Sequence, residues 1–478
     1  MKNNTVKPKA GVFMLSSEWF WNDGGIQNLF PDLPKKLEKD VKKITSKLSA
    51  NLDIIHAGLI TSKKQIDALA RKVMDNNVDL ILIVCVTWCD DSLLFAVLDA
   101  IPEQIPVLMW CYVPSKKLPE DISSGELIRR SGPVGALQFS GPMRRMKRKF
   151  QFVIGSPDDK DTIKDIKEWS ETLKLTRLLK NSTIGVLPYR CGYMTGTYTD
   201  EFRLMNEIGP KLKYISVAEY ASVVDSIKDA EVKQYISMLK GKYKVIDVSE
   251  KSLHRASKVS LGLAKLAINY NLNGVAIDDL SDELHNVLRL RPCLFTEDLF
   301  NRVVVTMEAD ISACVAMLIL KHLAKQSPMF TEFFTFDLEK NIVLAGHAGI
   351  HDVRLADKQK NVRIVPDYEY AGAKELEGAW MEFSAKSGKL TIVSLVDAKD
   401  KFQMIVTTGR SQPGTFYLKG YPHMNIKLDT SIKDFYAICT RAGITQHFAV
   451  AYGDHISQLR KLAEVLDLGF CVCLGFRV

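Results

Sequence analysis

Glutamate and histidine side chains at four positions of the chain could together hold a metal ion. The first, Glu308, follows the apolar run Arg302–Met307 and precedes a helical pattern that begins after Asp310. The run predicts a buried strand, so Glu308 is expected at a strand's carboxyl end, where open α/β sheets bind ligands. A carboxylate in apolar surroundings needs a metal ion or hydrogen bonds. The alternative is that Glu308 stabilises a helix terminus through its dipole, and the sequence favours neither.

Glu332 and His347 are predicted to face each other on a β-hairpin. Two strand-like runs flank the turn Asp337–Asn341. If Asp337 pairs with Ile342, the same register places Glu332 opposite His347, with Cβ atoms roughly 4.5–5.5 Å apart. Both side chains could then bind one ion. The alternative is an exposed pair at a sheet edge, and a register shift of one residue would separate the two side chains.

His447 completes the candidate set near the start of another expected strand, Thr445–Tyr452. Gly443, just before it, is typical of the end of a helix. A single histidine in such a strand is more often a core residue than a ligand. Two glutamates and two histidines nevertheless suit a divalent transition ion with open coordination positions, and Mn²⁺ is the expected metal.

The elements that must position these residues follow an α/β pattern over the first two thirds of the chain. Apolar runs alternate with amphipathic stretches, which predicts two Rossmann-like α/β domains with parallel sheets, residues 1–180 and 181–328. Strands then predominate, which predicts a mainly β, barrel-like domain over residues 329–478. The expected strands are Gly11–Leu15, Asp53–Ile60, Leu80–Thr87, Pro106–Trp110, Thr183–Leu187, Lys244–Val248, Asn273–Ile277, Phe330–Phe336, Ile342–His347, Lys389–Val396, Phe402–Thr408 and Gly414–Leu418. The expected helices include Leu33–Leu48, Lys63–Met74, Asp161–Leu179, Asp200–Leu212, Glu231–Lys240, Leu253–Tyr270 and Ile311–Ala324.

Composition excludes several classes of protein. The 478 residues are 46% hydrophobic and 25% charged, the balance of a globular chain with about two to four domains. No apolar run approaches the ~20 residues needed to cross a bilayer, so no membrane association is expected. The N-terminus has no signal-peptide pattern, and nine scattered cysteines suit a reducing compartment, which predicts a cytoplasmic protein.

Charge and phosphate-binding motifs give little support to other functions. The net charge is +8, and the one dense basic run, Arg144–Lys149, has no aromatic residues or recognition-helix pattern beside it. A solvated face or a subunit contact explains this run better than nucleic-acid binding. The sequence contains no GxxxxGK[ST], no GxGxxG after a strand and no GxSxG, which argues against P-loop, dinucleotide and serine-hydrolase chemistry.

The four candidate residues also lie in a segment that resembles the L-arabinose isomerase and L-fucose isomerase superfamily. The stretch TMEADISACVAMLILKHLAKQSPMFTEFFTFD resembles the part of the fucose isomerases that joins two metal-binding acids, which are Glu308 and Glu332 here. The arabinose isomerases also have a glutamate at the second position. Ala345-Gly346-His347, 15 residues after Glu332, occupies the place of the family's Gly-Ser-His, and His447 follows His347 at the family's interval of 100 residues.

The resemblance implies a metal-dependent aldose–ketose isomerase. The metal would chelate O1 and O2 of an open-chain sugar and stabilise an ene-diolate. Glu308 and Glu332 would serve as ligands and as the catalytic acid and base, and His347 and His447 as further ligands. It also implies two α/β domains followed by a β-rich one, and a homo-oligomer, a hexamer with active sites between subunits.

The chain departs from the family at several positions. The arabinose isomerases have paired histidines at the last ligand, whereas Gln446 precedes His447 here. The family's N-terminal sugar-contacting motif is not present in FMLSSEWFWNDGG. A divergent member with a different sugar is therefore expected. The alternatives are an isomerase of a branched, phosphorylated or sulfonated sugar, and a sugar-binding or regulatory protein without turnover.

Three further residues are candidates for substrate binding. Trp88 ends an expected strand and could offer an apolar surface to a sugar, although a core aromatic is an equally good explanation. Asp310 could hydrogen-bond a ligand or the sugar, or could act only as an N-cap. Arg291, before Pro292, could contact an anionic group.

Overall fold

The computed structural model describes residues 7–20, 30–369 and 378–473. The chain divides into two compact units, residues 1–177 and 178–478. The helix α6 (Lys160–Lys180) carries the chain across this division. No helix of the described part is both long and apolar enough to cross a membrane.

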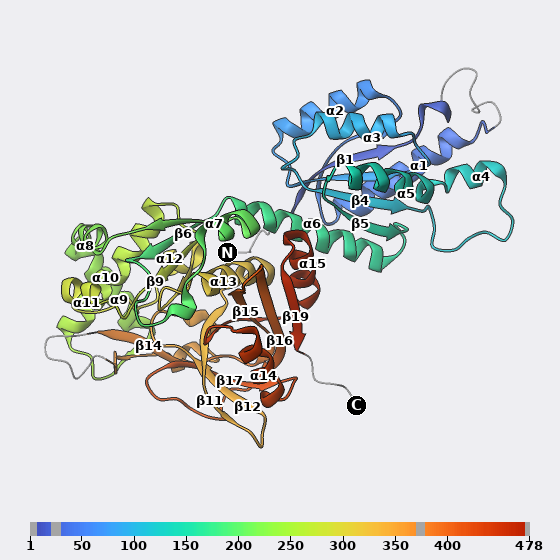
Figure 1. Ribbon diagram of the computed structural model, residues 1–478. Helices are drawn as coiled ribbons and strands as arrows, with labels where there is room; N and C mark the ends of the chain where they lie inside the picture. The colour runs from blue at the N-terminus through green and yellow to red at the C-terminus, as the bar shows by residue number, and fades with distance from the viewer. Residues whose placement is uncertain (1–6, 21–29, 370–377, 474–478) are drawn as a thin grey trace. The chain divides into compact units, whose positions relative to one another are not determined.

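The first unit is built on a five-stranded parallel sheet with the order β2-β1-β3-β4-β5 (Figure 1). The sheet forms because its central strands are continuous apolar runs, such as LILIVC, with every residue buried, as a sheet covered on both faces requires. Amphipathic helices cover it and bury their apolar positions. The strands are β1 (Lys9–Leu15), β2 (Asp53–Ile60), β3 (Leu80–Cys85), β4 (Val107–Tyr112) and β5 (Phe150–Gly155), and the helices are α1 (Leu33–Ser49), α2 (Lys63–Asp75), α3 (Asp91–Ala100), α4 (Ser124–Arg129) and α5 (Gly132–Arg145).

The second unit begins with a four-stranded parallel sheet of order β10-β9-β6-β7. This sheet is the α/β layer whose carboxyl edge carries Glu308. Its strands are β6 (Thr183–Leu187), β7 (Lys211–Tyr214), β9 (Gly274–Ile277) and β10 (Val304–Thr306), and the helices around it are α7 (Glu201–Arg203), α8 (Val217–Asp225), α9 (Asp229–Lys242), α10 (Glu250–Asn269), α11 (Asp282–Leu288), α12 (Glu297–Arg302) and α13 (Ile311–Ala324).

The remainder of the second unit is a closed antiparallel barrel. Six strands pair in the order β16-β15-β18-β11-β12-β17, and β17 pairs again with β16 to complete the ring. Four further strands extend the same sheet. The strands are β11 (Met329–Asp337), β12 (Ile342–Gly346), β15 (Gly388–Asp397), β16 (Phe402–Ser411), β17 (Pro422–Leu428) and β18 (His447–Tyr452), with β8 (Lys244–Val245), β13 (Arg363–Pro366), β14 (Ala379–Ser384) and β19 (Gly469–Cys473) beside them, and the helices are α14 (Ile432–Ala442) and α15 (Ile456–Leu466).

The predicted fold class is confirmed: parallel α/β sheets precede a mainly β, barrel-like part. The predicted boundary at residues 328/329 falls inside the second unit, between α13 and β11, and the division into three domains stays a prediction. Two expected elements are wrong. The expected helix Asp200–Leu212 stops at Ile208, because Gly209 adopts φ +126° and the chain then enters β7. The expected strand Gly414–Leu418 is a loop, in which the side chain of Asn425 bonds the backbone of Phe416.

Candidate metal centre

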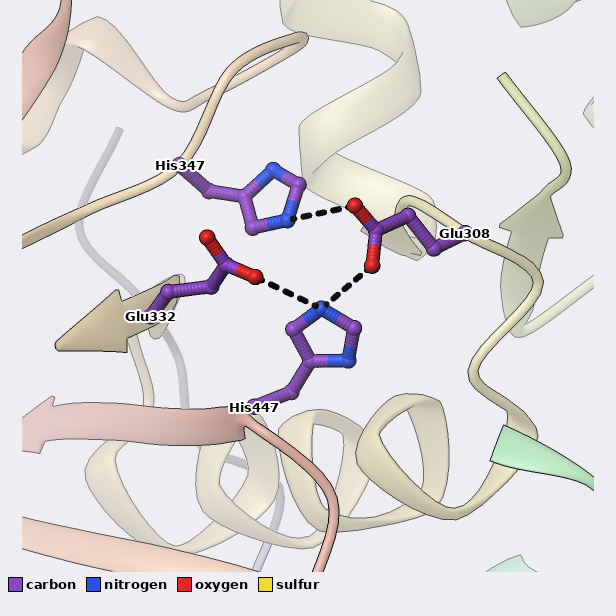
Figure 2. A group of neighbouring side chains, drawn as sticks. All are labelled: Glu308, Glu332, His347 and His447. Atoms are coloured by element: carbon purple, nitrogen blue, oxygen red, sulfur yellow. Dashed lines mark ion pairs between the residues drawn. The ribbon is translucent and has the colours of Figure 1, made fainter. Parts of the chain in front are cut away.

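Glu308 lies where the sequence predicts it, just after β10 at the carboxyl edge of the four-stranded sheet. Its backbone is unusual, because Glu308 and Ala309 both have positive φ, +56° and +49°. Left-handed backbone costs a non-glycine residue roughly 1–2 kcal/mol, so neighbouring contacts must maintain it. The turn brings the chain into α13, whose N-cap is Asp310, with its Oδ1 accepting from the backbone N–H of Ala313 at 2.7 Å. The buried carboxylate of Glu308 points toward His347 and His447 (Figure 2).

Glu332 lies on β11, with paired strands on both sides. It pairs with His447 of β18 and with Gly346 of β12. The predicted pairing of Asp337 with Ile342 is confirmed, but the predicted pairing of Glu332 with His347 is wrong by one residue. A β-bulge between Phe333 and Thr335 shifts the register. His347 still reaches the centre because β12 ends at Gly346 and the chain turns there.

Each histidine presents an Nε2 atom to the centre. The Nδ1 of His347 donates to the carbonyl oxygen of Ala348 at 2.8 Å, and the Nδ1 of His447 donates to Oδ2 of Asp310, also at 2.8 Å. A ring whose Nδ1 carries the donated proton keeps a lone pair on Nε2 when it is neutral. Neither Nε2 makes a hydrogen bond to the described residues, although both atoms are buried. Buried atoms of this kind are normally satisfied, so they are ready to bind a ligand.

The four side chains converge on one point (Figure 2). One ligand atom from each of Glu308, Glu332, His347 and His447 lies within 4.8 Å of the other three. The Nε2 of His447 is 3.0 Å from a Glu308 oxygen and 3.7 Å from a Glu332 oxygen, and the Nε2 of His347 is 3.8 Å from Glu308. Ligands about 2.0–2.2 Å from one ion are separated by such distances. The residues present therefore fit a single divalent ion.

Burial and mutual repulsion shape the protonation of this group. Burial, followed by the charge of Glu308, raises the pKa of Glu332 to about 7. Burial also lowers the pKa of His347. For His447, burial lowers the pKa, but the hydrogen bond to Asp310 and the nearby negative charge of Glu308 prevail and raise it to about 9. Two close carboxylates thus hold positive charge on His447, which is the electrostatic environment that a cation requires.

A cavity of about 520 Å³ opens beside Glu332. Gln446 lines it too, and the Nε2 of its amide donates to a Glu308 oxygen at 2.9 Å. The position that departs from the family's paired histidines thus contacts a proposed ligand. The other lining residues are mainly apolar or aromatic: Phe333, Phe334, Tyr436, Cys439, Thr440, Gly443, Ile444, Thr445 and Phe448.

The three predicted substrate contacts lie in different surroundings. Asp310 is fully buried and serves both as N-cap and as the hydrogen-bond partner of His447. The guanidinium of Arg291 is 1% exposed and is engaged by carboxylates of the chain itself. Trp88 follows β3 in the first unit, where its ring packs edge-on against Trp19 and its Nε1 donates to Gln138. A contact between any of the three and a substrate stays a prediction.

Sequence reasoning missed Asp279, which accepts the backbone N–H of Glu308 at 2.8 Å. A signal for it exists, because Asp278 and Asp279 directly follow the expected strand Asn273–Ile277, as Glu308 follows its own strand. The carboxyl ends of neighbouring parallel strands meet at one edge of a sheet.

Comparison with known proteins places these observations among sugar isomerases. A family model described as the L-arabinose isomerase C-terminal domain matches residues 327–469, which contain three of the four residues above. A sulfoquinovose isomerase of Priestia megaterium is 24% identical over 420 residues, 86% of this chain and 89% of that protein. An L-arabinose isomerase of Klebsiella pneumoniae subsp. pneumoniae is 21% identical over 355 residues, 71% of this chain and 69% of that protein.

Proposed function

The chain is a divergent member of the arabinose isomerase-like superfamily, and from that premise we propose that it is a metal-dependent aldose–ketose isomerase. The observation that carries the proposal is the convergence of Glu308, Glu332, His347 and His447, with two buried Nε2 atoms directed at their common centre. These four residues would hold the ion, and Mn²⁺ suits their mixed oxygen and nitrogen ligands. When bound, the ion would stabilise negative charge that develops on the sugar oxygens.

The two glutamates would move the proton. Aldose–ketose isomerisation takes a proton from C2 and returns one to C1, while another passes from O2 to O1, so no co-reactant is needed. Glu332 lines the cavity and is the better placed of the two to reach a sugar carbon. A carboxylate placed beside C2 and C1 can both accept and donate the proton. Glu308, which is more buried and fixed by Asp279 and Gln446, would serve chiefly as a ligand.

Two classes of sugar are candidates for the substrate. The more extensive match is to a sulfoquinovose isomerase, which favours a sulfonated sugar. The cavity, however, has no lysine or arginine among its described lining residues, which favours a neutral sugar. Trp88 would offer a sugar-facing surface, and the family suggests a homo-oligomer.

An interconversion assay tests the function and selects the substrate class. Mn²⁺-loaded protein is incubated with L-arabinose, L-fucose, other neutral aldoses and sulfoquinovose, and the ketose formed is measured by chromatography. We expect conversion of at least one sugar, its loss with EDTA, and its loss in Glu332→Gln, which retains the size of the side chain. Binding of sugars without conversion of any would favour a sugar-binding protein and contradict the proposal.

A further inference from the structure

The buried carboxylate of Asp279 supports the backbone of Glu308. Both oxygens of this carboxylate accept hydrogen bonds from other residues of the chain. Asp279 is 1% exposed. Its Oδ1 accepts the backbone N–H of Glu308 at 2.8 Å, and its Oδ2 accepts from Arg291 at 2.7 Å. The same carboxylate therefore joins an arginine to the backbone of a proposed metal ligand.

Arg291 is in turn fixed on its other side. Its Nε and one terminal nitrogen donate to the two oxygens of Asp367 at 2.9 and 3.1 Å, a bidentate contact that sets the orientation of the guanidinium. Glu369 accepts from the same terminal nitrogen, and the guanidinium lies over the ring of Trp380, 5.2 Å from its centroid. Arg291 thus links the carboxyl edge of the four-stranded sheet to the end of β13, which Asp367 follows.

The backbone of Glu308 requires such support. Glu308 and Ala309 both have left-handed backbone, and strain of this kind persists only when the surroundings fix it. Ala309 donates to the carbonyl oxygen of Ile277 at 2.8 Å, which secures the second residue. The contact to Asp279 secures the first, and a rotation of Glu308 about φ would break it and carry the carboxylate away from His347 and His447.

We infer that Asp279, Arg291 and Asp367 form a clamp that fixes the left-handed turn at Glu308 and so positions this ligand for the metal. This inference rests on the proposed metal site. The three residues are positioning residues, because they act through Glu308.

The variant Asp279→Asn tests the clamp with little change of volume. Asparagine can keep the contact to Glu308 only by turning its NH₂ group toward Arg291, where donor meets donor. We expect Mn²⁺ affinity, measured by calorimetry and by the electron paramagnetic resonance of free Mn²⁺, to fall about 10–100-fold, as for other residues that orient metal ligands. In Arg291→Lys, the lysine lacks the planar guanidinium that bridges Asp279 and Asp367, so Mn²⁺ affinity should fall to a similar extent. This variant provides the test if Asp279→Asn does not fold.

Arg363→Lys is the matched control. Arg363 pairs with the buried Glu382 at 3.0 Å in the same unit, and within the described part of the chain it forms no hydrogen bond or ion pair with the four proposed ligands. The Arg363→Lys variant should have a lower metal-free melting temperature and an unchanged Mn²⁺ affinity. Wild-type Mn²⁺ affinity in folded Asp279→Asn or Arg291→Lys, or an equal loss in Arg363→Lys, would overturn the clamp alone. A wild-type protein that binds no Mn²⁺ would instead overturn the proposed metal site on which the clamp depends.

Discussion

The ring of each histidine, His347 and His447, is oriented by an oxygen that accepts a hydrogen bond from its Nδ1. His447 is the clearer case, because Asp310 is fully buried and accepts from its Nδ1 while Thr445 donates to the same carboxylate oxygen. A carboxylate behind a histidine fixes the ring and its tautomer, and raises its basicity as a ligand. Asp310 thus orients a proposed metal ligand, His447, and at the same time begins α13.

Asp310→Asn should separate these two roles. Asparagine is as good an N-cap as aspartate, so α13 should still begin at residue 310, whereas the NH₂ group that then faces the Nδ1–H of His447 should lower the metal-free melting temperature. The charged acceptor of His447 is lost, and we expect Mn²⁺ affinity to fall about 10–100-fold by calorimetry. Asp310→Ala, which removes the cap too, should also lose roughly 1 kcal/mol of unfolding free energy. An unchanged Mn²⁺ affinity in Asp310→Asn would show that His447 needs no such partner.

His351 near the centre gives the protein a pH-dependent stability. Its ring is buried between the carbonyl oxygens of Phe330 and Gly349, and burial lowers its pKa to about 4. An unfolded histidine titrates near 6.5, so between pH 6.5 and 4 the unfolded chain binds a proton that the folded protein does not. The contribution of His351 to the unfolding free energy therefore falls as pH drops through this window, by about 2 kcal/mol between pH 7 and 5.

Chemical denaturation in EDTA at pH 7 and pH 5 measures this effect, with His351→Gln as the reference. Glutamine does not titrate, so the variant should lose less stability than the wild type over this interval, whatever its stability at pH 7. Equal losses in the two proteins would mean that His351 protonates as readily in the folded chain as in the unfolded one.

At the scale of elements, the position of the proposed metal ligands depends on where strands end and where they bulge. Gly346 ends β12 directly before His347, and an added Cβ would lie 2.4 Å from the carbonyl oxygen of Pro422 on β17. No real Cβ approaches an oxygen so closely, so β12 and β17 must separate to admit a side chain. Since His347 follows immediately, the separation would move a ligand.

Gly346→Ala should therefore weaken Mn²⁺ binding and lower stability by roughly 1–3 kcal/mol, as overpacking does. Gly241→Ala, in α9, is the control because nothing lies within 4 Å of its added Cβ. That substitution should be neutral or stabilising by up to ~1 kcal/mol. Calorimetric titration with Mn²⁺ and thermal melting of both variants give the answer. Equal Mn²⁺ affinity and equal stability in the two variants would show that the end of β12 at Gly346 does not determine the position of His347.

The sequence predicts most of the elements and the four residues that converge, for identifiable reasons. Apolar runs and amphipathic helices are local signals, and the hairpin turn at Asp337–Asn341 fixes the initial register. The bulge between Phe333 and Thr335 could not be predicted, because FFTF has no residue whose backbone preference marks it. The partner of Arg291 could not be predicted either, because Asp367 lies 76 residues away and is brought near by β13.

At the scale of the whole molecule, the second unit holds all four proposed ligands. The first unit has the strand order β2-β1-β3-β4-β5, which reverses between β1 and β3. Parallel sheets bind ligands outside the carboxyl ends of the strands at such a reversal, and Trp88 follows β3 there. This placement suits the predicted contact between Trp88 and a sugar. The hexamer and the cytoplasmic location stay predictions from the family and the composition.

The central claim is that carboxylates at a single metal centre transfer a proton between C2 and C1 of a sugar. Solvent exchange tests it most directly, because a proton held by a carboxylate can exchange with water before it is returned. Mn²⁺-loaded protein is incubated in D₂O with the neutral and sulfonated sugars named above, and deuterium at C1 and C2 is followed by nuclear magnetic resonance. We predict incorporation that disappears with EDTA and in Glu332→Gln. Incorporation that persists in either, or none with any of these sugars in a protein that binds Mn²⁺, would contradict the claim.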